Sequence, residues 1–136
     1  MKITGTIFIS IVLLLSSCAK KDGVVNDGLI GKWQLTEVYD GYFNGGGFKW
    51  NPIPSEDSHT LQFAVNGEFT QEYFNRGSNQ ICFGSYTIFP GMKVQINDNC
   101  NTVSYIKNVT ELSPSTLIID MQGIEGTIRF KYQAVQ

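Results

Sequence analysis

After residue 28, apolar side chains recur at every second position in short segments separated by turn-forming residues. This period of two is typical of β-strands with one buried face, and these segments lack the 3.6-residue stripe of an amphipathic helix. The alternation predicts eight consecutive strands, at 29–39, 59–64, 69–73, 82–88, 94–99, 103–112, 116–121 and 127–132. Eight antiparallel strands leave two exposed edges unless the sheet closes. We therefore expect an all-β, eight-stranded antiparallel up-and-down β-barrel, with a flattened β-sandwich as the alternative.

Turn residues predict the register of the hairpins. A three-residue loop around the Asn-Gly pair that follows the second strand places Phe63 opposite Phe69 and so aligns the apolar faces. A two-residue loop would put Phe63 opposite a threonine instead. For the last hairpin, a four-residue loop at 122–125 would set Ile119 opposite Ile128.

Two cysteines occupy opposed positions on the two strands of the central hairpin. A three-residue loop around its Pro-Gly pair sets Ile88 opposite Val94, and the same count sets Cys82 opposite Cys100. Opposed positions on adjacent antiparallel strands supply the Cα separation that a disulfide needs. We therefore predict a Cys82–Cys100 disulfide, which an oxidising cell envelope would maintain. The alternative is a pair of buried free thiols.

The N-terminus is typical of an export signal. A basic residue at position 2 precedes an apolar run at 3–15, and thirteen helical residues span about 20 Å against the ~30 Å hydrocarbon core of a bilayer. The pattern therefore predicts a signal peptide at 1–17 rather than a membrane-spanning helix. The third cysteine, Cys18, follows this segment directly.

The sequence Leu15-Ser16-Ser17-Cys18 resembles the lipobox of bacterial lipoproteins. In that family the cysteine becomes acylated and the chain is cleaved just before it. The resemblance therefore implies a membrane anchor at Cys18 and a mature protein from which the signal peptide has been removed. Residues 18–28 then form the lipidated cysteine with a flexible tether, and 29–136 form the folded domain. Ala19 is not the aspartate that marks inner-membrane retention in many such proteins, which favours the outer membrane, on its periplasmic face or at the cell surface. The alternative is an ordinary signal peptide with a chance cysteine.

A glycine- and proline-rich segment at 41–58 separates the first two predicted strands, and we expect no regular structure in it. It is long for a connection in a compact domain, and long loops often carry function. Its aromatic side chains are unusual for a solvated loop. These are Tyr42, Phe43, Phe48 and Trp50.

The first strand contains Gly31-Lys32-Trp33, which resembles the Gly-x-Trp motif of lipocalins. The long aromatic loop after that strand matches the loop with which lipocalins cover the mouth of the barrel. The mature chain as a whole resembles the short lipocalin-like domains of bacterial lipoproteins, which implies that Trp33 closes the barrel floor. Two features depart from the family. The lipocalin C-terminal helix is missing, and Arg129, the candidate for the arginine that stacks on this tryptophan, falls on the face opposite Phe130.

Catalytic and metal chemistry find little support in the sequence. Asp57, Ser58 and His59 are triad residue types, but neighbours along an extended chain point to opposite sides. His59 is the single histidine, so most zinc sites are excluded. The net charge of −2 offers no basic field for nucleic acid. We expect a protein without enzymatic activity, metal or cofactor.

Two functions fit these observations. The first is binding of a small hydrophobic ligand inside the barrel, with Glu37 able to orient it, since Glu37 falls on the same side as Trp33. The second is docking of an envelope protein through the aromatic loop, without a ligand. The direction of the loop aromatics, inward over a cavity or outward to solvent, separates the two. The expected ligand-contacting residues are Trp33, Leu35, Glu37, Leu61, Phe63, Phe69, Tyr73, Tyr86, Ile96, Tyr105 and Phe130.

Overall fold

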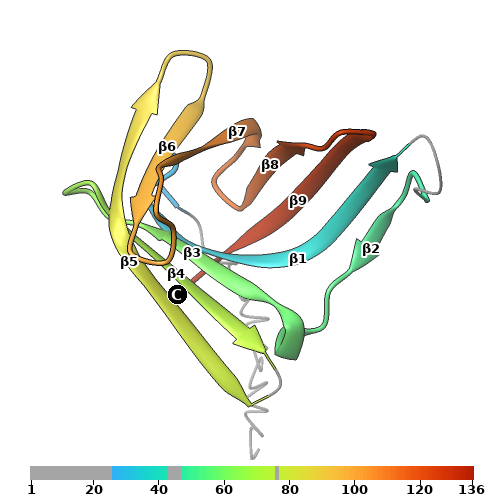
Figure 1. Ribbon diagram of the computed structural model, residues 1–136, viewed down its shortest axis with the longest axis horizontal. Coiled ribbons are helices and arrows are strands. Elements are labelled where there is room, and N and C mark those ends of the chain that lie inside the picture. Colours follow the sequence, from blue (N-terminus) through green and yellow to red (C-terminus); the bar gives the residue numbers. More distant parts are fainter. Residues whose placement is uncertain (1–25, 43–46, 76) are drawn as a thin grey trace, which may run out of the picture.

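A computed structural model describes residues 26–42, 47–75 and 77–136, and this part of the chain forms one antiparallel sheet of nine strands (Figure 1). The lipobox, Cys18 and Phe43 lie outside the described residues. The described part contains no helix with the length and hydropathy of a membrane span. The elements are β1 (Gly31–Tyr42), β2 (Trp50–Pro52), the 3₁₀ turn η1 (Ser55–Asp57), β3 (His59–Phe63), β4 (Glu68–Asn75), β5 (Ser78–Phe89), β6 (Lys93–Asp98), β7 (Tyr105–Leu112), β8 (Thr116–Gln122) and β9 (Gly126–Val135).

The sheet closes on itself through its first and last strands. One edge of β1 pairs with β3, and the other pairs with β9 from Lys32 opposite Val135 to Tyr42 opposite Gly126. Figure 1 shows these two long strands running side by side. The pairing removes both exposed edges, which an open sheet would leave available for aggregation. The predicted closed antiparallel fold is therefore confirmed, as one continuous ring rather than a sandwich of two sheets.

The segment 41–58 contains regular structure, contrary to expectation. Strand β2 pairs with the same edge of β1 as β3 does, with Tyr39 opposite Trp50. Pro52 and Pro54 carry no N–H group, so the strand cannot continue, and η1 intervenes before β3 begins. The ring thus has the eight predicted strand positions, and one of them is shared by β2 and β3.

The first and central hairpins have the predicted registers, with Phe63 opposite Phe69 and Ile88 opposite Val94. The register predicted for the last hairpin is wrong. Strand β8 continues to Gln122, and the turn closes with a 2.8 Å hydrogen bond from the Gly123 N–H to the Gly126 carbonyl. Ile119 consequently lies opposite Phe130 rather than Ile128. Because the shift is two positions, every side chain keeps its expected face but changes its partner.

Trp33 is fully buried inside the ring, as predicted, and its indole N–H donates a 2.9 Å hydrogen bond to the Leu29 carbonyl. Gly31 explains the glycine of the motif. Its φ of +136° is open to glycine, and a Cβ there would collide with the side chain of Asn26. Together these contacts join the chain entering β1 to the base of the core.

Candidate functional site

A cavity of about 310 Å³ lies on the interior face of the ring. Its volume is at the lower end of the range for small-molecule sites. Strands β3, β4, β7, β8 and β9 contribute its walls, which combine apolar side chains with hydroxyl, imidazole and ammonium groups. The lining residues are His59, Gln71, Tyr73, Tyr105, Ile106, Lys107, Ile119, Asp120, Met121, Phe130 and Tyr132. We call this space the interior cavity.

Three of the predicted ligand-contacting residues, Tyr73, Tyr105 and Phe130, line the interior cavity. The others do not line it, because their bulky side chains pack against one another and fill the rest of the ring. Phe63 lies at the centre of this packing, with ring centroids 5.3 Å from Phe69 and 5.1 Å from Tyr86. The residues absent from the cavity lining are Trp33, Leu35, Leu61, Phe63, Phe69, Tyr86 and Ile96.

Glu37 lies on the outer face, which corrects the prediction that it shares a side with Trp33. Leu35 is opposite Tyr132 in β9, but Glu37 is opposite Lys131, so β1 contains a bulge between positions 35 and 37. The extra residue reverses the alternation beyond it. The Glu37 carboxylate forms a 3.0 Å ion pair with Lys131 on the outside of the ring.

The aromatic side chains described in the 41–58 loop do not line the interior cavity. Trp50 packs on the outer wall, 5.5 Å from the ring of Tyr39, with the Lys131 ammonium 4.2 Å from its ring centroid. Phe48 is 55% exposed. The side chains of Tyr42 and Phe43 lie outside the description. An open and mostly polar hollow of about 720 Å³ runs along this outer wall, and Trp50 and Lys131 border it.

Arg129 also lies on the outer face and does not approach Trp33. Its guanidinium contacts both carboxylate oxygens of Asp120, at 3.1 and 3.2 Å, and lies 6.0 Å from the ring centroid of Tyr39. The two-position shift of the last hairpin creates this pair, because it sets Asp120 directly opposite Arg129. The stacking contact that the lipocalin resemblance implies is therefore absent at Arg129.

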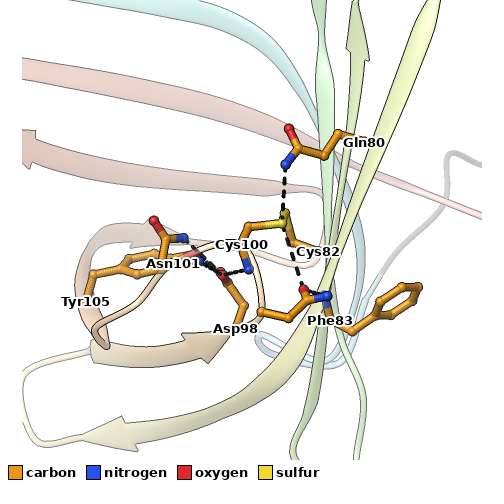
Figure 2. Close-up of a disulfide and its surroundings, with 8 residues drawn as sticks. Gln80, Cys82, Phe83, Asp98, Cys100, Asn101 and Tyr105 are labelled. Carbon is orange, nitrogen blue, oxygen red and sulfur yellow. Dashed lines mark hydrogen bonds between the residues drawn. A yellow bond between two sulfur atoms is a disulfide. The ribbon is translucent and has the colours of Figure 1, made fainter.

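The buried carboxylate of Asp98 accepts hydrogen bonds from its surroundings (Figure 2), one of them from Tyr105, which lines the interior cavity. The Tyr105 hydroxyl donates to Oδ2 at 2.6 Å, while the Cys100 N–H, the Asn101 N–H and the Asn101 amide donate to Oδ1 at 3.0 Å each. Burial alone would raise the pKa of Asp98, but these bonds outweigh it and lower the pKa below its ordinary value. Asp98 is thus an anion held by three hydrogen bonds at Oδ1 and one at Oδ2.

The predicted disulfide is confirmed. Cys82 and Cys100 are bonded, with Cα atoms 5.5 Å apart, and the Gln80 amide contacts the Cys100 sulfur at 3.5 Å (Figure 2). One oxygen of Asp98 and the two sulfurs lie within 4.8 Å of one another. Because both sulfurs are consumed by the disulfide, this cluster lacks the thiolates that a zinc site requires.

Reasoning from the sequence missed eight of the eleven residues that line the interior cavity, and Lys107 is the cationic one among them. It sits between Tyr105 and Val109 on the inward face of β7 and lies opposite the fully buried Val94. Burial lowers the pKa of Lys107 to about 8, an effect that the charge of Asp98 partly offsets. The available signal was a lysine at an apolar position of an alternating strand.

His59 and Tyr132 join β3 to β9 across the interior. His59 Nε2 lies 2.9 Å from the Tyr132 hydroxyl, and their rings meet edge to face. Burial, and secondarily the charge of Lys107, lower the pKa of His59 to about 4, so the imidazole is neutral at pH 7. The neighbouring Ser58 hydroxyl donates to the Leu35 carbonyl at 2.7 Å rather than to the imidazole, so these residues do not form a triad.

No protein-family model matches the chain, and no curated protein matches it. Among solved structures, the chain is similar to the crystal structure of a lipocalin-like protein from Bacteroides uniformis. The TM-score is 0.60 at 20% sequence identity, and the match covers 79% of this chain and 98% of that one. At this identity the similarity concerns the fold alone. It shows, together with the closed antiparallel sheet, that the chain has a lipocalin-like fold.

Proposed function

We propose that this protein is a lipid-anchored, lipocalin-like binding protein of the outer membrane that takes up a small, mainly apolar molecule. The observation that carries this proposal is the interior cavity, which remains open although bulky side chains fill the rest of the ring. Allowing ~30 Å³ for each non-hydrogen group, as for a water molecule in the liquid, about 310 Å³ holds about ten such groups. Among the described residues, the Ser58 hydroxyl is bonded to a backbone carbonyl rather than to a base, and the role that we propose is binding.

Met121 offers a direct test, because it borders the cavity and is 50% exposed. Met121→Trp should obstruct the cavity without disturbing the packed core. Ile124→Trp is the matched control, since Ile124 is fully exposed in the turn of the same hairpin. All variants carry Cys18→Ser in the full chain, so that no acyl chain competes for the cavity.

We expect 1-octanol to shift backbone amide signals of β7, β8 and β9 in an NMR titration, in the parent chain and in the Ile124→Trp control. Met121→Trp should weaken this binding about tenfold or more, because steric exclusion of one well-placed apolar group is worth roughly 1–3 kcal/mol. Equal binding by all three proteins, or no binding by the parent chain, would refute the cavity as a ligand site.

The anchoring part of the proposal is supported by the lipobox resemblance at Leu15 to Cys18. Intact mass of the purified protein should show an N-terminal Cys18 carrying fatty acyl chains, and fractionation should recover it with the outer membrane. Cys18→Ser should release the protein from the membrane fraction. Retention of an unmodified Cys18 in a soluble fraction would contradict the anchor while leaving the binding proposal intact.

A second function, docking of an envelope protein, is favoured by the outward direction of Trp50 and the 55% exposure of Phe48. Photo-crosslinking from position 48 in living cells tests it, with position 124, which is exposed on another turn, as the control. A discrete crosslinked partner at position 48, lost on Trp50→Ser, would support docking. Identical crosslinking patterns from both positions would count against it.

A further inference from the structure

We propose that the interior cavity selects ligands with an anionic head, of the carboxylate class, which Lys107 recognises while the apolar wall holds the tail. This inference rests on the proposed ligand-binding function and names the chemistry of its ligand. It is carried by one juxtaposition: a cation without an anionic partner inside a cavity that also has an apolar wall.

The Lys107 side chain is directed into the cavity. Its neighbours two positions away on β7, Tyr105 and Val109, pack with the core, and Lys107 itself lines the cavity. Its ammonium lies 5.4 Å from the ring centroid of Tyr105 and has no hydrogen bond or ion pair with any described residue. Because the described residues include no buried side-chain nitrogen without a hydrogen-bond partner, the ammonium must face the solvent in the cavity.

The acidic groups nearby are already engaged. Asp98 is held by the hydroxyl of Tyr105, two backbone N–H groups and the Asn101 amide. Asp120, at the cavity border, forms an ion pair with Arg129. The Lys107 ammonium is therefore left to the solvent, and a carboxylate from the ligand would replace that solvent with a charge-assisted hydrogen bond.

The remainder of the cavity suits a short hydrocarbon tail. Ile119, Met121 and Phe130 supply apolar surface from β8 and β9, and β8 pairs with β7, the strand that carries Lys107. The cavity volume of about ten non-hydrogen groups corresponds to octanoate, which has eight carbons and two oxygens. Its matched neutral analogue is 1-octanol, which keeps the tail and removes the charge.

The experiment compares octanoate with 1-octanol by NMR titration of the Cys18→Ser full chain at pH 7. We expect octanoate to bind about tenfold more tightly, because a hydrogen bond to a charged group is typically worth this factor or more. Lys107→Met should abolish the preference for octanoate over 1-octanol, and Lys107→Arg should restore it. Lys93→Met, at an exposed position of β6, is the control for a general loss of charge.

The outcomes separate this inference from the function on which it rests. If 1-octanol and octanoate bind equally, or if the preference persists in Lys107→Met, the inference that Lys107 selects an anionic head is refuted. The interior cavity would still be a ligand site. Failure of both probes to bind the parent chain would overturn the ligand site and the inference with it. Loss of the preference in Lys93→Met as well would show that it arises from net charge and would overturn the role of Lys107.

Discussion

Lys107 and Asp98 face the interior of the same ring with opposite charges, yet these two side chains form no ion pair. Asp98 instead accepts the 2.6 Å hydrogen bond from Tyr105 and three bonds from the turn that follows β6. The disulfide at Cys100 holds that turn against β5. A cation is thereby kept available inside a largely apolar enclosure, at a cost to stability.

That cost is measurable. Lys107→Met should stabilise the protein by about 1–2 kcal/mol at pH 7, because the lysine pKa falls from 10.5 to about 8 on folding and partial exposure reduces the full effect. Urea denaturation measures the change. The control Lys93→Met should alter the free energy of unfolding by less than about 0.5 kcal/mol. A destabilised Lys107→Met would indicate that packing of the lysine stem outweighs the buried charge.

Octanoate binding should weaken as the pH rises from 7 to 9, because Lys107 loses its proton near pH 8. The other groups that face it hold their charge in this window. The pKa of His59 is about 4, that of Asp98 is lowered, and burial raises those of Tyr73, Tyr105 and Tyr132; Asp120 is engaged with Arg129.

Titration of octanoate at pH 7, 8 and 9 tests this, with 1-octanol as the reference. We expect a decline of about tenfold across the range for octanoate and a constant affinity for 1-octanol. Lys107→Arg should remove the decline, since its guanidinium stays charged. An equal decline for both probes would point to loss of structure rather than deprotonation.

Protonation of His59 should make the protein less stable in mild acid. Its pKa is lowered from 6.5 to about 4 in the folded state, so the unfolded chain binds more protons between these values and stability falls as the pH drops through them. We expect a loss on the order of 2 kcal/mol between pH 7 and pH 4.5 from this group. Denaturation curves of His59→Gln should show a shallower pH dependence, and an unchanged slope would contradict the assignment.

Removing the disulfide should cost about 3 kcal/mol, since it links residues separated by 18 positions. The double variant Cys82→Ser, Cys100→Ser measures this by urea denaturation under non-reducing conditions. Reductant should lower the urea midpoint of the parent protein to that of the double variant, and it should leave the midpoint of the double variant unchanged. If reductant has no effect on the parent, the bond does not contribute as described.

Gly31→Ala should destabilise the protein more than Gly28→Ala. Both glycines have positive φ, +136° and +61°, but a Cβ on Gly31 would collide with Asn26, whereas one on Gly28 meets nothing within 4 Å. Backbone strain alone costs roughly 1–3 kcal/mol, so the collision should add to it only at Gly31. Thermal denaturation of the two variants compares them, and equal losses would exclude the Asn26 contact as the reason for the motif glycine.

Features decided by short-range geometry were predictable from the sequence. The Asn-Gly and Pro-Gly turns predicted the pairs Phe63–Phe69 and Ile88–Val94, and the second register led to the Cys82–Cys100 disulfide. The predicted register of the last hairpin was wrong because its turn contains two glycines, Gly123 and Gly126, which fit more than one loop length. Trp33 was placed correctly because alternation assigns its face directly.

The sequence by itself determined the all-β class, the closed order of strands and most hairpin registers, since these follow from a period of two and from local turn chemistry. Only the tertiary structure decided which side chains surround the interior cavity. The bulge in β1 that moves Glu37 outside arises from pairing with β9, almost a hundred residues away, and no local pattern encodes it. The cavity around Lys107 likewise depends on how far side chains from five strands reach into a shared volume.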